Sequence, residues 1–513
     1  MKFRVERVRK HISGRSPAAT ETIPTRLTYW SLLAVILLLA LLIRTIPLTY
    51  SHFWDETVYL QHAKVIVDGR TNYDEFDYRP PLLPFLYALG FAAWDHVYVA
   101  NLVQGVVTTL AVLFIFLYVK PLFGPAPAMF AAFLLAFTPY FVRASHDLLT
   151  DMPAVMFILA AMWLFDKPGA RFAFLSGVVS ALAVQTRFTS LFVFVYFALD
   201  AALSLRKKFG SLVLLLAGAA VAIAPYLIWV RWNYGDFLHP FAIARRITDE
   251  WTAPVPPSFY YNGLLQIFPF SMLLLLGLGI LFASARAARH RRTGDSGGLL
   301  AGWAEAGAPG KRQLVLLTWG LAFLAYMLSI PHKEVRYLLP LAIPVAVISA
   351  VSLAESVLWL SRRTIPVRVA SLLLCLVLVT VDYLPPFQKL MKPWVDRSES
   401  ETVRIARYLR EVSALDDTVY AAHDFPVLAF YSERRTVSLL PIQANFDKAW
   451  RDLMTRPGFF VYFDPTGITE THSVTPSFKP DRPFLEASPN FRAVRVFSRG
   501  TVYRYEPARE QRR

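Results

Sequence analysis

Two adjacent carboxylates, Asp55 and Glu56, follow the first long apolar run of this 513-residue sequence, which covers about residues 29–48. A charge held in or near hydrocarbon is costly unless it is paired or hydrated. A chain that keeps two such charges beside an apolar run is therefore expected to use them, and both residues are candidate catalytic groups. The alternative is a hydrated pair that caps a helix outside the membrane.

The residues after this pair extend its chemistry if they form a helix. In a helix over 55–68, Asp55, Tyr59 and His62 share one face, because they stand four and seven residues apart. The helix dipole favours an ionised carboxylate near the N-terminus, as a general base requires. Asp55 is the expected base and Tyr59 an expected substrate contact, although packing at the membrane interface also explains Tyr59 and His62.

A second cluster, Asp77-Tyr78-Arg79-Pro80-Pro81, precedes another apolar segment. The prolines fix an extended entry into residues 82–94, which are too few to cross a bilayer and are expected to lie in its interface. Arg79 at this junction suits a phosphate of a substrate. An anchor to lipid headgroups explains it equally well.

A third cluster lies between two apolar runs and contains His332, Lys333, Glu334 and Arg336. If a helix begins here, spacings of three and four gather the cations, and such a group suits a phosphate or pyrophosphate at the bilayer surface. Lys333 and Arg336 are therefore expected to bind phosphate, with His332 and Glu334 as further substrate contacts. A structural network of ion pairs is the alternative.

A looser fourth cluster extends from Arg143 to Pro153, between the third and fourth apolar runs. It includes His146 and Asp151 and mixes acidic with basic side chains, as the other clusters do.

Membrane-spanning helices are expected to hold these clusters in place. Hydrophobic residues make up 55% and aromatic residues 14% of the chain, and the mean hydropathy is +0.41, which exceeds what a soluble core of this size needs. The apolar runs have the length that spans a bilayer. Eleven spans are predicted: one over about 29–48, one over 97–119, one that ends near 143, one that begins near 151, and others over 171–186, 188–204, 211–230, 264–283, 313–330, 337–358 and 369–385.

The net charge of +16 reports topology rather than nucleic-acid binding, because the Lys and Arg residues lie between apolar runs. Basic connectors at 206–208, 289–292 and 362–368 are expected in the cytoplasm, together with the basic N-terminus, residues 1–28. The four clusters and the C-terminal segment then lie on the extracytoplasmic side of the plasma membrane. Cys375 is the only cysteine, which excludes an internal disulfide.

The C-terminal segment has a different pattern. From residue 398 onward, short strand patterns alternate with amphipathic helical ones, which is typical of a small α/β domain. The predicted organisation is therefore an all-α polytopic membrane domain over 29–390, followed by an extracytoplasmic α/β domain over 391–513.

The order of these features resembles the GT-C superfamily of integral-membrane glycosyltransferases, in particular the branch of protein O-mannosyltransferases and lipid A aminoarabinose transferases. The acidic pair after the first span, a proline pair before an interfacial helix and a Thr-Asp-Met-Pro element match residues 55–56, 80–82 and 148–153. Residues 332–337 resemble the His-Lys-Glu-x-Arg-aromatic signature of related lipid-linked mannosyltransferases.

The resemblance implies transfer of a sugar, mannose or another hexose or pentose, from a polyprenyl-phosphate donor to a hydroxyl of a protein, lipid or glycan acceptor, with inversion. Asp55 would deprotonate the acceptor, and Glu56 or Asp151 would position it. The implied donor-phosphate ligands are Lys333, Arg336, Arg79 and Arg143. In the protein mannosyltransferases an arginine that contacts this phosphate precedes the second-loop aspartate by five residues; here that position is His146, and Arg143 is the nearest arginine.

The sequence requires no cofactor, and it leaves a divalent metal open because no ligands can be assigned. A transporter or flippase of a lipid-linked saccharide is the alternative from another class. It would need similar cations, but the sequence has no obvious internal repeat and its charges lie in loops, which favours transfer chemistry.

Overall fold

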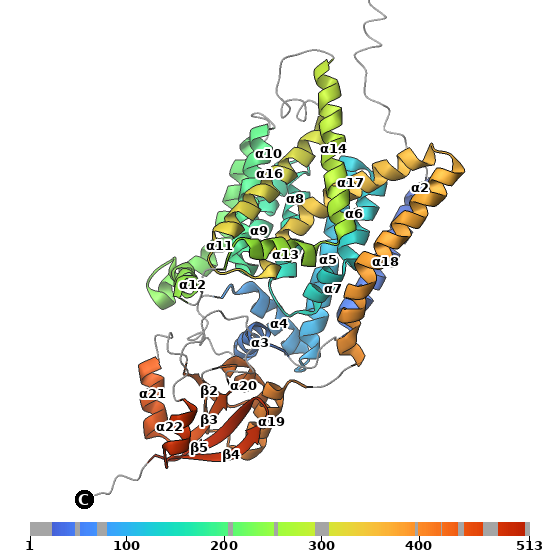
Figure 1. The fold of residues 1–513 in the computed structure, drawn as a ribbon. Coiled ribbons are helices and arrows are strands. Elements are labelled where there is room, and N and C mark those ends of the chain that lie inside the picture. Colours follow the sequence, from blue (N-terminus) through green and yellow to red (C-terminus); the bar gives the residue numbers. More distant parts are fainter. Residues whose placement is uncertain are drawn as a thin grey trace, which may run out of the picture.

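The computed structural model describes residues 23–46, 52–68, 79–203, 209–250, 255–292, 307–395, 399–421, 423–439, 446–464 and 481–507. A long bundle of helices occupies one end of the molecule and a small sheet domain the other (Figure 1). The fold class expected from the sequence is confirmed. Most of the basic N-terminal segment, 1–28, and of the connector around 293–306 lies outside the described residues.

The bundle is built from helices that follow the apolar runs. Its elements are α2 (Ile23–Thr45), α3 (Trp54–Val67), α4 (Leu82–Ala93), α5 (Tyr98–Phe123), α6 (Pro125–Phe137), α7 (Pro139–His146), α8 (Asp151–Phe165), α9 (Ala170–Thr186), the 3-10 helix η1 (Phe188–Phe192), α10 (Val193–Leu203), α11 (Phe209–Tyr234), α12 (His239–Glu250), α13 (Ser258–Ile267), α14 (Phe270–Arg292), α16 (Gly307–Ser329), the 3-10 helix η2 (Val335–Leu341), α17 (Ala342–Ser361) and α18 (Ile365–Val395).

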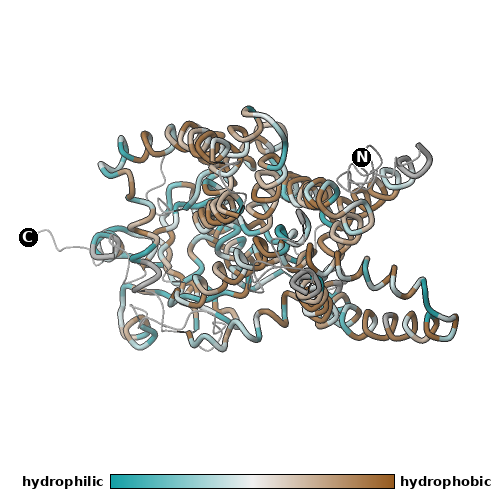
Figure 2. The backbone as a smooth tube through the Cα atoms, turned by 90° about the horizontal axis from the view of Figure 1, so that it is seen from above, coloured by the Kyte–Doolittle hydropathy of each residue, from teal (hydrophilic) through white to brown (hydrophobic). Residues whose placement is uncertain are grey.

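Six of the described helices are each long and apolar enough to cross a membrane, and two bent pairs, α6 with α7 and α13 with α14, raise the number to eight. The remaining expected spans fall on the shorter apolar helices α8, α9 and α10. Each expected run thus forms a helix, while the count of eleven crossings stays a prediction. Large hydrophobic side chains are exposed along α2, α11 and α18, and hydrophobic residues line the bundle helices in Figure 2. These faces are suited to lipid contact, as in an integral membrane protein.

Helices α9 and α11 pack at backbone contact, which fixes the end of α9. A Cβ atom added at Gly177 would lie 1.8 Å from the carbonyl oxygen of Leu215, and one at Gly218 would lie 2.0 Å from that of Phe174. Only glycine permits so close an approach at either position. Near the end of α9, Nε2 of Gln185 donates a hydrogen bond to the Ala222 carbonyl oxygen of α11 at 3.1 Å, so the segment that leads into the polar turn is also held against α11.

Helices α3 and α4 lie between the bundle and the sheet domain (Figure 1). Helix α3 begins at Trp54, one residue before the helix over 55–68 that the sequence analysis considered. Its first turn is capped by a carboxylate: Oε2 of Glu56 accepts a hydrogen bond from the Phe53 N–H at 2.9 Å. Helix α4 starts directly after Pro80-Pro81 and is 12 residues long. Its length agrees with an interfacial rather than a spanning segment.

The C-terminal domain contains α19 (Glu401–Val412), β1 (Thr418–Ala421), α20 (Phe425–Ser432), β2 (Arg435–Ser438), α21 (Phe446–Thr455), β3 (Gly458–Phe463), α22 (Arg482–Ala487), β4 (Phe491–Phe497) and β5 (Gly500–Tyr505). Its described strands form one sheet in the order β2-β1-β3-β5-β4; β1 is parallel to β2 and β3, and β5 is antiparallel to β3 and β4.

Each face of this sheet has its own hydrophobic core. One core contains side chains of α19, α20 and the strands, and the other lies under α21 and α22. The first core also includes Val58 of α3, which is fully buried there. The helical and sheet domains are therefore joined through α3.

Candidate active site

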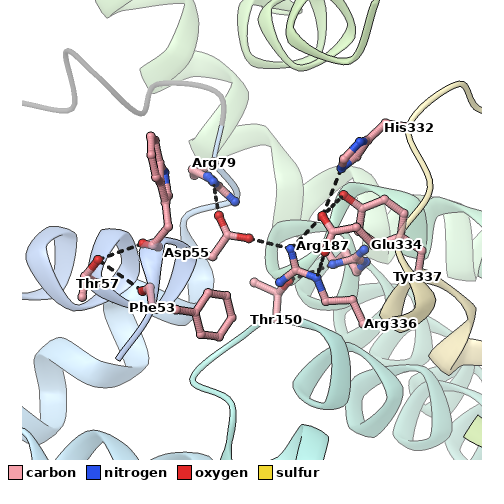
Figure 3. Close-up of polar contacts among 11 residues, drawn as sticks. Phe53, Asp55, Thr57, Arg79, Thr150, Arg187, His332, Glu334, Arg336 and Tyr337 are labelled. Carbon is pink, nitrogen blue, oxygen red and sulfur yellow. Dashed lines mark hydrogen bonds and ion pairs between the residues drawn. The ribbon is translucent and has the colours of Figure 1, made fainter. Parts of the chain in front are cut away.

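The carboxylate of Asp55 lies between two arginines from distant parts of the chain (Figure 3). Its Oδ1 is 2.5 Å from Nη2 of Arg79, just before α4, and its Oδ2 is 2.5 Å from Nη2 of Arg336, in η2. All three side chains are about 17–18% exposed, so the ion pairs are largely shielded from water. Three of the residues selected from the sequence thus meet at the N-terminus of α3.

The two arginines govern the protonation of Asp55. Burial alone would raise the pKa of this carboxyl, but the charges of Arg79 and Arg336 outweigh it and lower the pKa to about 2. Asp55 is therefore ionised at neutral pH, and it is a weak base while both arginines hold it.

Arg336 also pairs with its near neighbour Glu334. Its Nε is 2.6 Å from Oε2 of Glu334 and its Nη2 is 2.9 Å from Oε1, so the contact is two-pronged. The same Oε1 accepts a hydrogen bond from the Tyr337 hydroxyl at 2.8 Å and lies 3.1 Å from Nε2 of His332. Burial works against ionisation of Glu334, but Arg336 and His332 hold the pKa of this carboxyl well below its usual value.

Lys333 lies apart from these carboxylates. Its side chain is only 7% exposed, and its ammonium donates a hydrogen bond to the Ile330 carbonyl oxygen at 2.6 Å. Within the described residues this ammonium forms no ion pair with a carboxylate. Lys333 is thus a buried cation with a neutral contact, and burial lowers its pKa.

Arg187, in the turn held by α9 and α11, completes the cluster. Its Nη1 is 2.9 Å from Oδ1 of Asp151 and 3.2 Å from Oγ1 of Thr150, and its guanidinium lies 4.7 Å from the centre of the Tyr337 ring. The sequence analysis did not select Arg187. The signal was present, because Arg187 is a charged residue between two apolar runs with no linker, like those at 332–336.

The charges of this cluster balance when the paired groups are counted. Three guanidinium groups face three carboxylates, contributed by Arg79, Arg187 and Arg336 and by Asp55, Asp151 and Glu334. An anion that enters must therefore replace a carboxylate as an arginine partner, or pair with Lys333.

Glu56 makes a different set of contacts from its neighbour. Its Oε2 caps α3, and its Oε1 accepts a hydrogen bond from the Leu148 N–H at 2.8 Å, in the segment between α7 and α8. That segment contains Asp147, another residue that the sequence analysis did not select. Burial, and then the charge of Glu56, raise the pKa of Asp147 to about 7.

The remaining expected residues lie around this centre. Tyr59 is buried on α3 with its ring 5.6 Å from the Arg79 guanidinium, and His62 is buried one turn further along. Burial, and then Arg79, lower the pKa of His62 to about 3, so it is neutral. Arg143 is exposed on α7, whereas His146 is buried at the end of α7 beside Arg44 of α2.

Among the described residues, no three His, Cys, Asp or Glu side chains come together in a way that could hold a metal ion. What the geometry offers is therefore a carboxylate base candidate beside a group of cations. Such a site suits chemistry on a phosphate-bearing substrate.

Two family models match this chain. Residues 78–229 match the dolichyl-phosphate-mannose-protein mannosyltransferase family, and residues 254–387 match the Alg9-like mannosyltransferase family. The first match includes Arg79, Asp151 and Arg187, and the second includes Lys333 and Arg336. A search of curated protein sequences gives no significant match.

Solved structures share the fold across most of the chain. ArnT from Cupriavidus metallidurans bound to undecaprenyl phosphate superposes with a TM-score of 0.63 at 14% identity, over 92% of this chain and 97% of that one. The oligosaccharyltransferase AglB from Archaeoglobus fulgidus, in complex with an inhibitory peptide and a dolichol-phosphate, gives a TM-score of 0.57 at 13% identity, over 86% of this chain and 70% of that one.

Proposed function

We propose that this chain, a membrane glycosyltransferase of the GT-C type, transfers a sugar from a polyprenyl-phosphate donor to an acceptor hydroxyl with inversion at the anomeric carbon. The observation that carries the proposal is the position of Asp55 between Arg79 and Arg336. It places a potential base and two potential phosphate ligands at one point. The lipid phosphates in the structures of ArnT and AglB support a donor of this class.

The donor phosphate of such a substrate carries one negative charge as a phosphodiester. Lys333 is a suitable first contact, because its buried ammonium has a neutral hydrogen-bond partner. Arg336 and Arg79 are the next ligands, and each must leave Asp55 at least in part to turn toward the phosphate. Arg143, exposed on α7, is a further candidate cation for the donor phosphate.

This exchange also prepares the base. While both arginines hold Asp55 its pKa is about 2, which is too low for efficient proton abstraction at neutral pH. When the phosphate takes over one arginine, the carboxylate loses part of the charge that stabilises it and its pKa rises. Asp55 therefore becomes an effective base only after the donor has bound.

The chemical step needs one proton acceptor and no separate acid. Asp55 takes the acceptor's hydroxyl proton as the oxygen forms a bond to the anomeric carbon, and the bond from that carbon to the phosphate oxygen breaks on the opposite side. The polyprenyl phosphate leaves with the electron pair, stabilised by Lys333, Arg336 and Arg79. Attack from the side opposite to the leaving group inverts the anomeric configuration.

The other acidic residues position this centre. Glu56 ties the first turn of α3 to the segment before α8 through two backbone N–H groups, so we assign it a supporting role beside Asp55. Asp151 fixes Arg187. Tyr59, His332, Glu334 and His146 then shape or support the donor side.

We further propose that the N-terminus is cytoplasmic and that the site and the domain over 391–513 are extracytoplasmic. The basic connectors of the sequence support this orientation. A lipid-linked donor reaches α4 and η2 through the bilayer, so binding it requires no nucleotide-binding motif.

The test uses purified protein in lipid nanodiscs with a panel of polyprenyl-phosphate sugars, including mannose, other hexoses and pentoses. Protein, lipid and glycan fractions of the host membrane serve as acceptors. We expect one donor to support transfer with inverted product configuration, and an Asp55→Asn variant to lose it. Transport of the intact lipid-linked sugar across the bilayer, with no transfer from any donor, would contradict the proposal.

A further inference from the structure

Helix α3 belongs to two hydrophobic cores at once. On one side Tyr59 and Leu60 pack with Leu83 and Tyr87 of α4, in a cluster against which Phe430 of α20 also packs. On another side Val58 is fully buried in the core formed by α19, α20 and the sheet. The helix that carries Asp55 is thus held from both domains, as its place in Figure 1 shows.

The C-terminal domain contacts residues both before and after Asp55 in the sequence. Before it, the His52 N–H donates a hydrogen bond to the Tyr431 hydroxyl at 3.0 Å. Trp54 packs edge-on against Phe425 of α20, with ring centres 4.9 Å apart. After it, Nε2 of Gln61 donates to a carbonyl oxygen of α20, that of Pro426, at 2.5 Å.

Helix α20, which makes these contacts, has a conformation fixed at both ends. In the described part of the chain, the two non-glycine residues with positive φ are Asp424 (51°) and Glu433 (56°), and they flank this eight-residue helix. Such conformations cost free energy and persist only where the surroundings enforce them. The Asp424 carboxylate is held by the Thr402 hydroxyl at 3.0 Å.

The contact between the domains continues toward the end of α3. Phe430 of α20 packs against the cluster that includes Ala63 of α3, and Lys64, Arg407 and Glu433 line a cavity of about 530 Å³ beside it. The C-terminal domain therefore contacts α3 from the residues beside Asp55 to its later turns.

We propose that the C-terminal domain positions Asp55 for proton transfer, with Trp54 and Tyr431 as positioning residues. This rests on the proposed function, in which Asp55 is the base. Trp54 is its direct neighbour in the chain, so a shift of the Trp54 ring on α20 moves the carboxylate relative to Arg79 and Arg336. A misplacement of about 1 Å at a reacting group can lower a rate by roughly a hundredfold.

The experiment compares two tryptophans that pack on opposite faces of the C-terminal sheet. Trp54 packs on the core beside α20, whereas Trp450 packs on the core of the opposite sheet face. We expect Trp54→Ala to lower kcat roughly ten- to a hundredfold with little change in the KM for acceptor, and Trp54→Phe to recover most of the loss. Trp450→Ala should stay near the wild-type kcat. Equal losses from Trp54→Ala and Trp450→Ala would overturn the proposal, because the domain would then act only through its overall stability.

A double-mutant cycle tests the same proposal by thermal stability, without a transfer assay. Thermal unfolding is measured for Trp54→Ala, Asp55→Asn and the combined variant, each in detergent. If Trp54 holds Asp55 against its arginines, Asp55→Asn must cost less stability in the Trp54→Ala background than in the wild type. Additive effects would refute the positioning role, and they would do so even if the panel of donors had failed to identify a substrate.

Discussion

Replacing Asp55 by Asn should separate donor binding from catalysis. The amide keeps the shape of the side chain but removes the negative charge that holds Arg79 and Arg336. Under the proposed function, the donor phosphate competes with this carboxylate for the arginines. We therefore expect the variant to bind the lipid phosphate more tightly while it loses transfer.

The structure sets the size of both effects. Each arginine makes a 2.5 Å contact with Asp55. A charge-assisted hydrogen bond contributes about 1.5–3 kcal/mol. In the variant the donor does not have to displace such a contact, so the Kd of the donor should fall roughly ten- to a hundredfold. Loss of the general base should lower kcat by roughly a hundredfold or more.

The assay is equilibrium binding of a radiolabelled polyprenyl phosphate to purified protein, combined with turnover at saturating donor. Asp166→Asn is the matched control, since Asp166 also lies 2.5 Å from an arginine, Arg312, but in a separate buried network of the bundle. It should leave the lipid-phosphate Kd unchanged. Weaker or unchanged binding by Asp55→Asn would refute the exchange of arginines between carboxylate and phosphate.

Three further predictions follow from the same geometry. Lys333→Ala should raise the donor KM roughly tenfold or more and leave the acceptor KM unchanged, measured as initial rates against each substrate; equal effects on both would remove Lys333 from the phosphate site. Arg336→Lys should retain only part of the donor affinity, because an ammonium cannot make the two-pronged contact that Arg336 makes with Glu334; a variant with full affinity would argue against a guanidinium-specific role. Asp147 predicts a pH dependence of stability, because burial and the charge of Glu56 raise its pKa to about 7 in the folded protein. From about pH 4 to 7 the folded protein keeps a proton on this carboxyl that the unfolded chain has released, so the wild type should lose stability as pH rises through this window. In detergent, melting temperatures from pH 5 to 8 should fall less for Asp147→Asn, and parallel curves would contradict the shift.

The sequence was sufficient to predict the helical membrane architecture, and three of the residues that it selects, Asp55, Arg79 and Arg336, lie together in the structure. Apolar runs of bilayer length and acidic residues just inside the first turn of α3 are local signals, and the structure follows them. Lys333 and Arg336 were also recognisable as candidates, because ionisable residues between two apolar runs are costly at a membrane and usually have a function.

The pairing of these residues was beyond the sequence. The Arg336 guanidinium was expected to offer free charge with only Glu334 to offset it, but in the structure it also holds Asp55, 281 residues away in the chain. Spacing along a helix predicts neighbours three or four residues apart, whereas a contact across the fold depends on how helices pack. For the same reason, the apolar pattern of α3 indicates that Val58 is buried without indicating which domain buries it.

The placement of Val58 in the C-terminal core has a consequence for synthesis of the protein. Phe425 and Leu428, its partners in that core, follow it by about 370 residues, which a ribosome adding about 5–20 residues per second needs roughly 20–70 s to produce. During that interval α3 has emerged, but the face that includes Val58 has no partner. Asp55, the proposed base, is therefore translated early but positioned only after the C-terminal domain has folded, so a truncated chain should insert its helices without the positioned carboxylate.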